Sequence, residues 1–215
     1  MNRDKLKSTH SLASHFDHHS IMFKRPHSTK TLSPLRSSDL RKLRDELIQL
    51  YPLSIPHVKQ LLPDKLLTSK ATTHLDESIT LYYAPSNEPD PRFIKISHSK
   101  GGASTRDLLV PTCYTFDLLP NLLPVLETAE QVIDNLQSGS ALFTAGVSLT
   151  SLNALPDGIR EGDLVAIVVY GQKERVVAVG QLGASKEQLV KDDRKGKAVI
   201  TVRLLSCSLY TFKFI

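Results

Sequence analysis

Four basic side chains near the N-terminal end are the residues of this sequence best suited to binding a polyanion. Arg36, Arg41, Lys42 and Arg44 lie close together in sequence. Lysine and arginine neutralise phosphate groups, and such contacts anchor a nucleic acid backbone without reading its base sequence. If one surface of a helix presents them, the sequence predicts a phosphate-binding patch.

The leucines of the same segment predict the helix that would carry this patch. They recur at spacings of three and four, which is typical of one buried helix face over residues 39–50 (Leu40, Leu43, Leu47, Leu50). Ser38 is the predicted N-cap, and Asp39 suits the first turn. An alternative stays open, in which the charges form a solvated face with pairs four residues apart (Arg41 with Asp45, Lys42 with Glu46).

The net charge of +5 is concentrated before residue 51. Residues 1–50 hold ten Lys or Arg and five Asp or Glu, whereas residues 51–215 hold seventeen of each. This asymmetry indicates a polyanionic partner. The polar, histidine-rich residues 1–33 show no periodicity, so we expect a disordered extension without a fixed metal site.

A second candidate surface combines small residues, an aromatic and two lysines. Gly139, Ala141, Phe143 and Gly146 belong to a short strand bracketed by glycines, where a backbone can approach RNA closely. Alternation along the strand places Leu142 and Phe143 on opposite faces, so one of them belongs to the core. The alternative is that this strand only closes a barrel. Two basic residues nearer the C-terminus, Lys195 and Lys197, are further candidates for RNA contact.

Short apolar segments separated by turns predict the elements that hold these candidates. Residues 79–83 and 92–96 flank a proline-rich turn and predict a hairpin. Helices are expected from Pro56 and from Pro111, and after a capping box of Thr128 with Gln131. Later strands are expected at the end of the sequence, with a second capping box at Ser185 (141–143, 164–170, 175–181, 198–202). Their near-continuous apolar character is typical of a small barrel buried inside and out.

Other classes of function find no support in the sequence. Ser, His and Asp occur without a nucleophile elbow or zinc-hydrolase spacing, so we predict no catalytic residues and no enzyme activity. Cys113 and Cys207 are far apart, which argues against a zinc ribbon or a disulfide framework. No run of eighteen apolar residues occurs, so we expect no membrane span; no cofactor is implied either.

Three segments resemble the PUA fold when they are taken in order. They are Gly139-Ser140-Ala141-Leu142-Phe143-Thr144-Ala145-Gly146-Val147, Ile159-Arg160-Glu161-Gly162-Asp163-Leu164-Val165-Ala166 and Val177-Ala178-Val179-Gly180. Ala145 stands where this loop usually has proline, and the acidic residue and tryptophan that usually end the last strand are missing. Residues 203–215 therefore read as an atypical tail.

The upstream sequence resembles the domain that precedes the PUA in the family of the ligatin-type eukaryotic translation initiation factor two-D, paralogous to the malignant T-cell-amplified oncoprotein. The resemblance rests on Met22-Phe23-Lys24, on the helix ending at Tyr51-Pro52, and on Val110-Pro111-Thr112-Cys113-Tyr114-Thr115. It implies a cytoplasmic factor that binds 40S ribosomal subunit rRNA and acts on tRNA in non-standard initiation or in recycling of tRNA and mRNA. It also implies a partner with a SUI1-like domain, or C-terminal domains absent from this sequence.

The resulting expectation is an α+β chain with a small α/β pre-PUA domain at residues 34–119 and a PUA-like RNA-binding domain at residues 120–202. The expected function is docking of a translation factor on the 40S subunit. A ribosome-biogenesis adaptor that binds precursor rRNA through the same fold is the alternative. Neither reading follows from composition alone.

Overall fold

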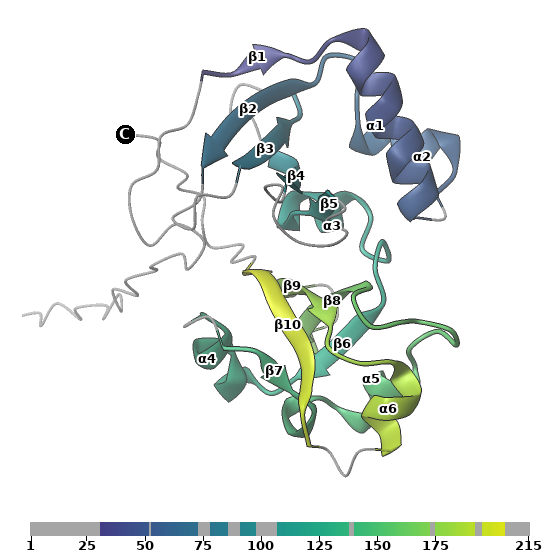
Figure 1. Cartoon of the computed structure of the whole chain (residues 1–215), viewed down its shortest axis with the longest axis vertical. Helices are drawn as coiled ribbons and strands as arrows, with labels where there is room; N and C mark the ends of the chain where they lie inside the picture. The colour runs from purple at the N-terminus through teal and green to yellow at the C-terminus, as the bar shows by residue number, and fades with distance from the viewer. Residues whose placement is uncertain are drawn as a thin grey trace, which may run out of the picture.

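A computed structural model describes most of the chain after residue 30. The described residues are 31–51, 53–72, 78–85, 91–97, 107–137, 140–172, 175–191 and 195–204. The expected extension at 1–33 and the expected tail at 203–215 fall outside them, apart from residues 31–33 and 203–204. Helices accompany two five-stranded sheets, one above the other in Figure 1, which confirms the α+β class.

The first sheet is antiparallel, and its strands follow one another in sequence order. Its strands are β1 (Ser33–Pro34), β2 (Leu67–Thr72), β3 (Ser78–Tyr83), β4 (Pro91–Ser97) and β5 (Leu108–Pro111). The predicted hairpin is β3–β4, with Ile79 opposite Ile96. The sequence analysis missed β2, because most of its residues are small or polar and only alternate ones are buried.

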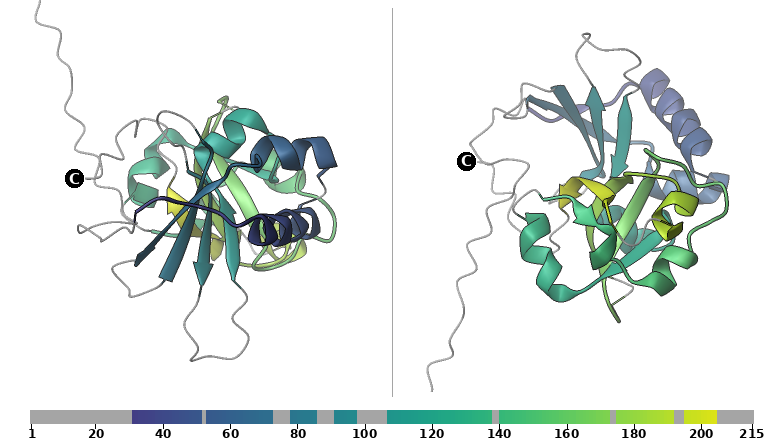
Figure 2. Two further views of the ribbon diagram at one scale, coloured as in Figure 1. Left: turned by 90° about the horizontal axis from the view of Figure 1, so that it is seen from above. Right: turned by 60° about the horizontal axis from the view of Figure 1, so that its bottom comes forward.

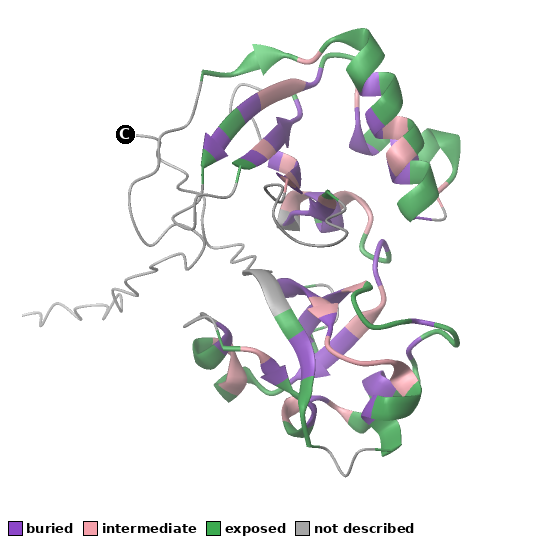
Figure 3. Ribbon diagram, in the orientation of Figure 1, coloured by how far each residue is buried: buried purple, intermediate pink, exposed green. Residues whose placement is uncertain are grey.

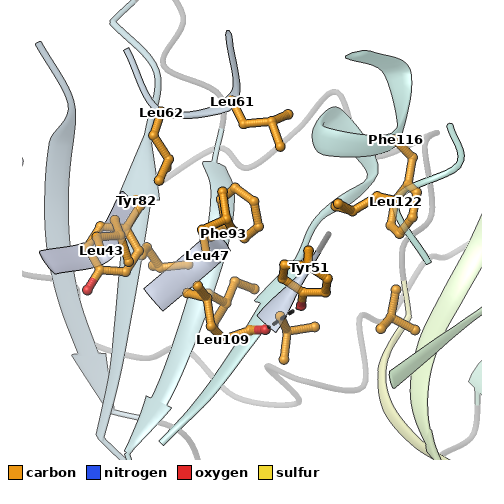
Figure 4. Packing of buried hydrophobic residues seen from close by; sticks show 14 of the residues in the cluster. Leu43, Leu47, Tyr51, Leu61, Leu62, Tyr82, Phe93, Leu109, Phe116 and Leu122 are labelled. Carbon is orange, nitrogen blue, oxygen red and sulfur yellow. Dashed lines mark hydrogen bonds between the residues drawn. The ribbon is translucent and has the colours of Figure 1, made fainter. Parts of the chain in front are cut away.

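Three helices accompany this sheet: α1 (Ser37–Leu50), α2 (Ile55–Leu61) and α3 (Cys113–Leu118). Leu40, Leu43 and Leu47 of α1 are buried, as predicted, but Leu50 is 52% exposed. Tyr51 is buried instead, and its hydroxyl donates a hydrogen bond of 3.0 Å to the Leu109 carbonyl (Figure 4). The prediction of Ser38 as N-cap is wrong, since α1 begins at Ser37, its N-cap is Arg36 and no side chain caps it.

The second sheet has the order β6-β8-β9-β10-β7. Its strands are β6 (Val125–Thr128), β7 (Leu142–Phe143), β8 (Leu164–Val169), β9 (Val176–Leu182) and β10 (Lys197–Leu204). Strand β6 pairs in parallel with β8, and the other pairs are antiparallel. A single bridge between Thr128 and Val147 leads back to β6, so the sheet curls toward closure. Strand β10 continues two residues past the expected end of the PUA domain at residue 202.

Short helices complete this half of the molecule. They are the 3-10 helices η2 (Glu130–Val132) and η3 (Thr144–Gly146), and α4 (Ile133–Gln137), α5 (Leu149–Asn153) and α6 (Lys186–Lys191). The capping box predicted at Thr128 is wrong: its hydroxyl donates to the Gly146 carbonyl at 2.7 Å, and Ala129 is the N-cap. The capping box at Ser185 is confirmed, since its N–H donates to Gln188 Oε1 at 3.2 Å.

One hydrophobic cluster spans both sheets. It includes α1, the first sheet, Leu122 and Leu123 of the connection, two alternate residues of β8 (Ala166, Val168) and two residues of β9 (Val176, Val179). The intervening β8 residues Val165 and Ile167 belong to a second cluster inside the curled sheet. Buried residues therefore occupy both faces of β8, which explains its continuous apolar run (Figure 3). No helix in the described ranges is long and apolar enough to cross a membrane.

Candidate nucleic-acid interface

Helix α1 presents three of the four predicted basic residues to solvent. Arg36, Arg41 and Lys42 are exposed, and we call them the helix patch. Arg36 is the residue that precedes the helix, and Arg41 makes a long contact of 3.4 Å with the Ser37 carbonyl. Their charges are available to an external anion, because no ion pair joins them to another described residue.

The charge pairs of the alternative reading are not formed between the described residues. Glu46, the expected partner of Lys42, lies 2.9 Å from Lys95 Nζ in β4. Asp107 is a second, more distant partner of Lys95, at 3.5 Å. Burial lowers the pKa of Lys95, but the hydrogen bond and charge of Glu46 outweigh that effect and hold the pKa above its usual value. Lys95 therefore binds α1 to the sheet, and Lys42 remains without this carboxylate.

Arg44 differs from the other three basic residues, because its guanidinium is engaged inside the protein. Nη2 and Nε donate to the Leu62 carbonyl at 2.6 and 3.1 Å, and Nη2 lies 2.8 Å from Asp64. The hydrogen bond from Arg44 and its charge hold the pKa of the Asp64 carboxyl below its usual value. Arg44 thus joins α1 to the segment that follows α2. Of the four candidates, it has the least freedom to contact RNA.

Strands β7 and β10 place an aromatic residue opposite a lysine. Phe143 is 53% exposed and Lys197 lies opposite it in the strand register, while Lys195 is exposed just before β10. We call these three residues the strand patch. Leu142 is fully buried, which confirms that one member of the Leu142–Phe143 pair belongs to the core. An unpaired base could stack on the exposed ring of Phe143, while a neighbouring lysine contacts the adjoining phosphate.

Two of the remaining small-residue candidates, Ala141 and Gly146, lie within the described residues on either side of Phe143 in sequence. Ala141 is half-buried just before β7, and Gly139 lies outside the described residues. Gly146 ends η3, where an added Cβ would lie 3.3 Å from Leu142 Cδ1 and 3.7 Å from Val132 Cγ2. Its φ is not in the left-handed region, so tight packing rather than backbone conformation favours glycine there.

Sequence analysis missed an exposed residue on the same strand, Ile200, which is 53% exposed and lies opposite Gln181 in β9. The continuous apolar run Ala198-Val199-Ile200 conceals which side chain faces outward. Val199 is buried and Ile200 is exposed because of how β10 pairs with β7 and β9. Such pairing between distant strands cannot be read from the local sequence.

The two patches lie at opposite ends of the molecule rather than in one site. Helix α1 lies beside the first sheet in Figure 1, and β7 and β10 lie on the second sheet; the turned views of Figure 2 keep them apart. An RNA that contacted both would have to extend across the protein. Within the described ranges, no three His, Cys, Asp or Glu side chains gather into a possible metal site.

Comparisons with known proteins give the two halves their family. A family model described as "Pre-PUA-like domain" matches residues 23–120, and one described as "elF2D, PUA domain" matches residues 123–206. The chain carries a Pre-PUA-like domain followed by a PUA domain of the eIF2D type. This confirms the resemblance found in the sequence, and the PUA match reaches beyond the last residue of β10.

Curated eIF2D proteins align with most of this chain. Mouse eukaryotic translation initiation factor 2D is 30% identical over 181 residues, which are 83% of this chain and 29% of the mouse protein. The human protein is 28% identical over 179 residues, which are 82% of this chain and 28% of that protein. The chain thus spans less than a third of the length of these relatives.

Solved archaeal structures share the fold at low identity. A PUA domain protein of Aeropyrum pernix, solved as a tartrate complex, matches with a TM-score of 0.57 and 20% identity, covering 86% of this chain and 90% of that chain. A hypothetical protein of Pyrococcus horikoshii matches with a TM-score of 0.55 and 20% identity, covering 81% and 94%. Both alignments extend over the two halves of the chain, so the combination is a recurring architecture.

Proposed function

We propose that this chain is an RNA-binding module of a cytoplasmic translation factor that docks on the 40S ribosomal subunit. Its relatives are named eukaryotic translation initiation factor 2D, and it carries their PUA domain. The observation that supports RNA binding by this chain is the exposed Phe143 with Lys197 opposite it in the PUA sheet. We propose residue 120 as the start of that domain.

The helix patch would supply the sequence-independent part of the affinity. Arg36, Arg41 and Lys42 are exposed, and their charges are not paired with described carboxylates. Contact with rRNA phosphates would release counterions, so affinity should fall as the salt concentration rises. Such contacts would position the module on the subunit without selecting a base sequence.

The strand patch would supply a more specific contact. RNA proteins read unpaired bases by stacking them on aromatic rings, and Phe143 is the exposed aromatic of this strand pair. Lys195 and Lys197 would then neutralise the adjoining phosphates. An unpaired nucleotide beside a helix, in rRNA or at a tRNA end, has the chemistry that this surface fits.

The proposed role is binding and positioning rather than catalysis. Non-standard initiation, or recycling of tRNA and mRNA, would need further protein parts, either the additional length found in eIF2D proteins or a partner with a SUI1-like domain. The present chain would contribute the contacts that hold such parts on the subunit.

A pelleting assay through sucrose tests the proposal. Purified chain is mixed with 40S, 60S or 80S particles at several salt concentrations, and bound protein is quantified. We expect saturable binding to 40S that weakens with salt and weakens further in Arg41→Glu/Lys42→Glu. The control Lys65→Glu/Lys70→Glu changes the net charge equally at exposed positions outside both patches. Equal loss in both double variants, or equal binding to 60S, would overturn 40S docking.

The same assay separates the alternative of a ribosome-biogenesis adaptor. Labelled precursor rRNA fragments are added in place of mature subunits under identical salt conditions. Tight binding to precursor fragments without binding to 40S would replace the translation role with one in biogenesis.

A further inference from the structure

A cavity between the two sheets is lined by none of the residues of the helix patch or the strand patch. Its volume is about 630 Å³, within the size range of ligand-binding pockets. The end of α1, the start of β5, the connection at residues 121–124 and the loop before β8 all line it. Both halves of the molecule therefore contribute to its walls.

The walls are mainly apolar, and one rim is left uncovered. Tyr51, Leu109 and Leu122 belong to the core cluster that Figure 4 shows, and they form part of the cavity lining. Leu50 lines the rim and is 52% exposed, although the helix pattern places it on the buried face. An apolar rim of this kind is typical of a surface that another molecule covers.

The charged residues that line the cavity within the described ranges are acidic. They are Asp107 and Asp163, and none of the described lysines or arginines lines it. Asp107 is only the distant partner of Lys95, since Glu46 lies closer. One Asp163 oxygen accepts a hydrogen bond from the Arg160 N–H, which fixes the carboxylate at the cavity. Phosphates would be repelled here, so this cavity is chemically the opposite of the helix patch.

We propose that this cavity, which we call the acidic groove, is a docking site for a segment of a partner protein. The occupant carries apolar side chains that cover Leu50 and the Tyr51 region, next to a lysine or arginine that meets Asp107 and Asp163. Charge complementarity selects a basic protein segment over RNA, and also over another acidic protein surface.

Because residues from both halves line the groove, docking would also fix their relative placement. A segment seated there contacts the end of α1 and the loop before β8 at once. The proposal is independent of RNA binding, since none of the residues of the helix or strand patches lines the groove.

Selection of peptides from a displayed library of random dodecapeptides tests the proposal. The full chain is the bait, and Asn121→Trp, which places a bulky ring at an exposed lining position, removes unrelated binders. Enriched peptides are resynthesised with a fluorophore and titrated by anisotropy. We expect two or more apolar residues beside a lysine or arginine, and at least tenfold weaker binding to Leu50→Gln and to Asn121→Trp.

Two further variants test the contribution of the two aspartate charges and the location of the peptide site. Asp107→Asn/Asp163→Asn keeps the side-chain size and an acceptor oxygen but removes both charges, so it should weaken the basic peptides and flatten their salt dependence. Phe143→Ala, in the strand patch, should bind the peptides like the wild type. Circular dichroism verifies that each variant is folded.

Several outcomes would overturn the proposal. They are a selection without enrichment, enriched peptides that are acidic, or peptides that bind Leu50→Gln and wild type equally. Competition by single-stranded RNA would assign the groove to nucleic acid. Concentration-dependent dimerisation that Leu50→Gln abolishes, measured by sedimentation velocity, would assign it to a second copy of this chain.

Discussion

Lys197 in β10 lies directly opposite Phe143 in β7, and both side chains are exposed. We predict that Phe143→Ala weakens 40S binding by about 1–3 kcal/mol, the usual value of one base–aromatic stack. The free energy of unfolding should fall by less than about 1 kcal/mol, because an exposed cross-strand pair contributes little. Pelleting with 40S and urea unfolding measure the two quantities.

Conservative variants control this prediction. Phe143→Tyr retains a stacking ring and should bind like the wild type, whereas Phe143→Leu retains apolar area without the ring and should bind like Phe143→Ala. The neighbouring change Leu142→Ala should instead destabilise the fold by about 2–5 kcal/mol, since Leu142 is fully buried. Equal 40S affinity of Phe143→Leu and wild type would contradict stacking.

Changing the helix patch should alter the salt dependence of 40S binding without unfolding α1. In Arg41→Glu/Lys42→Glu, each lost phosphate contact should lower the slope of log K against log salt by about 0.7–0.9. New like-charge pairs with Asp45 and Glu46 should cost only about 0.2–0.5 kcal/mol each. The buried leucines of α1 stay in place. If the folded variant shows an unchanged slope of log K against log salt, this helix face faces solvent and makes no phosphate contact.

Removing Arg44 should affect stability more than RNA binding. Arg44→Ala leaves the Leu62 carbonyl without its two donors, and hydrogen bonds to a charged group contribute about 1.5–3 kcal/mol. Asp64→Asn should have a much smaller effect, because the Asp64 carboxylate is exposed. Urea unfolding at neutral pH measures both. A loss of 40S affinity in Arg44→Ala at full stability would reverse this assignment.

The Arg44–Asp64 pair should also make stability depend on acid pH. The folded pKa of Asp64 is lowered, so its contribution is present above the unfolded pKa and is lost as the pH falls through the folded pKa. The stability difference between wild type and Asp64→Asn should therefore vanish in acid. A difference that persists after the carboxyl is protonated would mean that the substitution acts through another contact.

Substitutions of two glycines should distinguish tight packing from backbone strain. Gly146→Val should destabilise by about 1–3 kcal/mol through overpacking against Leu142. Gly162→Ala should cost about 1–2 kcal/mol for a different reason, since Gly162 has φ +88° and open space around its Cα. Adding Leu142→Ala should relieve part of the Gly146→Val defect but none of the Gly162→Ala defect. Additive effects in both double variants would contradict the distinction.

Local patterns predicted the parts of this structure that local physics determines. The leucine spacing of α1, the hairpin β3–β4 and the capping box at Ser185 each rest on neighbours in sequence, and the structure confirms them except at Leu50, which is exposed. The capping box predicted at Thr128 is wrong because its hydroxyl donates a hydrogen bond to the Gly146 carbonyl, which is distant in sequence, instead of capping the helix. Strand β2 was missed because long-range pairing, rather than β-propensity, holds its small and polar residues in place.

The candidate site was predictable in composition but not in arrangement. Arg36, Arg41 and Lys42 are exposed as the helix periodicity suggests, yet nothing local indicates that Arg44 reaches the Leu62 carbonyl. The Phe143–Lys197 pairing likewise joins residues far apart in sequence. Contacts of this kind depend on how the sheets and helices assemble, which spacing along one element does not encode.

The hydrophobic cluster that spans both sheets predicts that the chain unfolds as one cooperative unit. Val168 of β8 packs into the cluster of the first sheet, while its neighbour Ile167 packs inside the second. We expect coincident urea transitions from two probes, single tryptophans placed at the exposed positions Ile55 and Tyr170 of this tryptophan-free chain. Truncating the shared cluster should then lower both midpoints together.

Val168→Ala tests this coupling because it removes buried surface only at the contact between the sheets. Its cost should be about 2 kcal/mol, from two lost methylene equivalents and a small cavity. Ile167→Val, inside the second sheet, is the matched control and should cost about 0.5–1.5 kcal/mol. If the halves are coupled, the two probes shift equally in both variants. If Val168→Ala makes the two probes report different unfolding midpoints, the two halves are independently folding units that the shared cluster holds together. The shape of the groove between them would then depend on the packing of Val168.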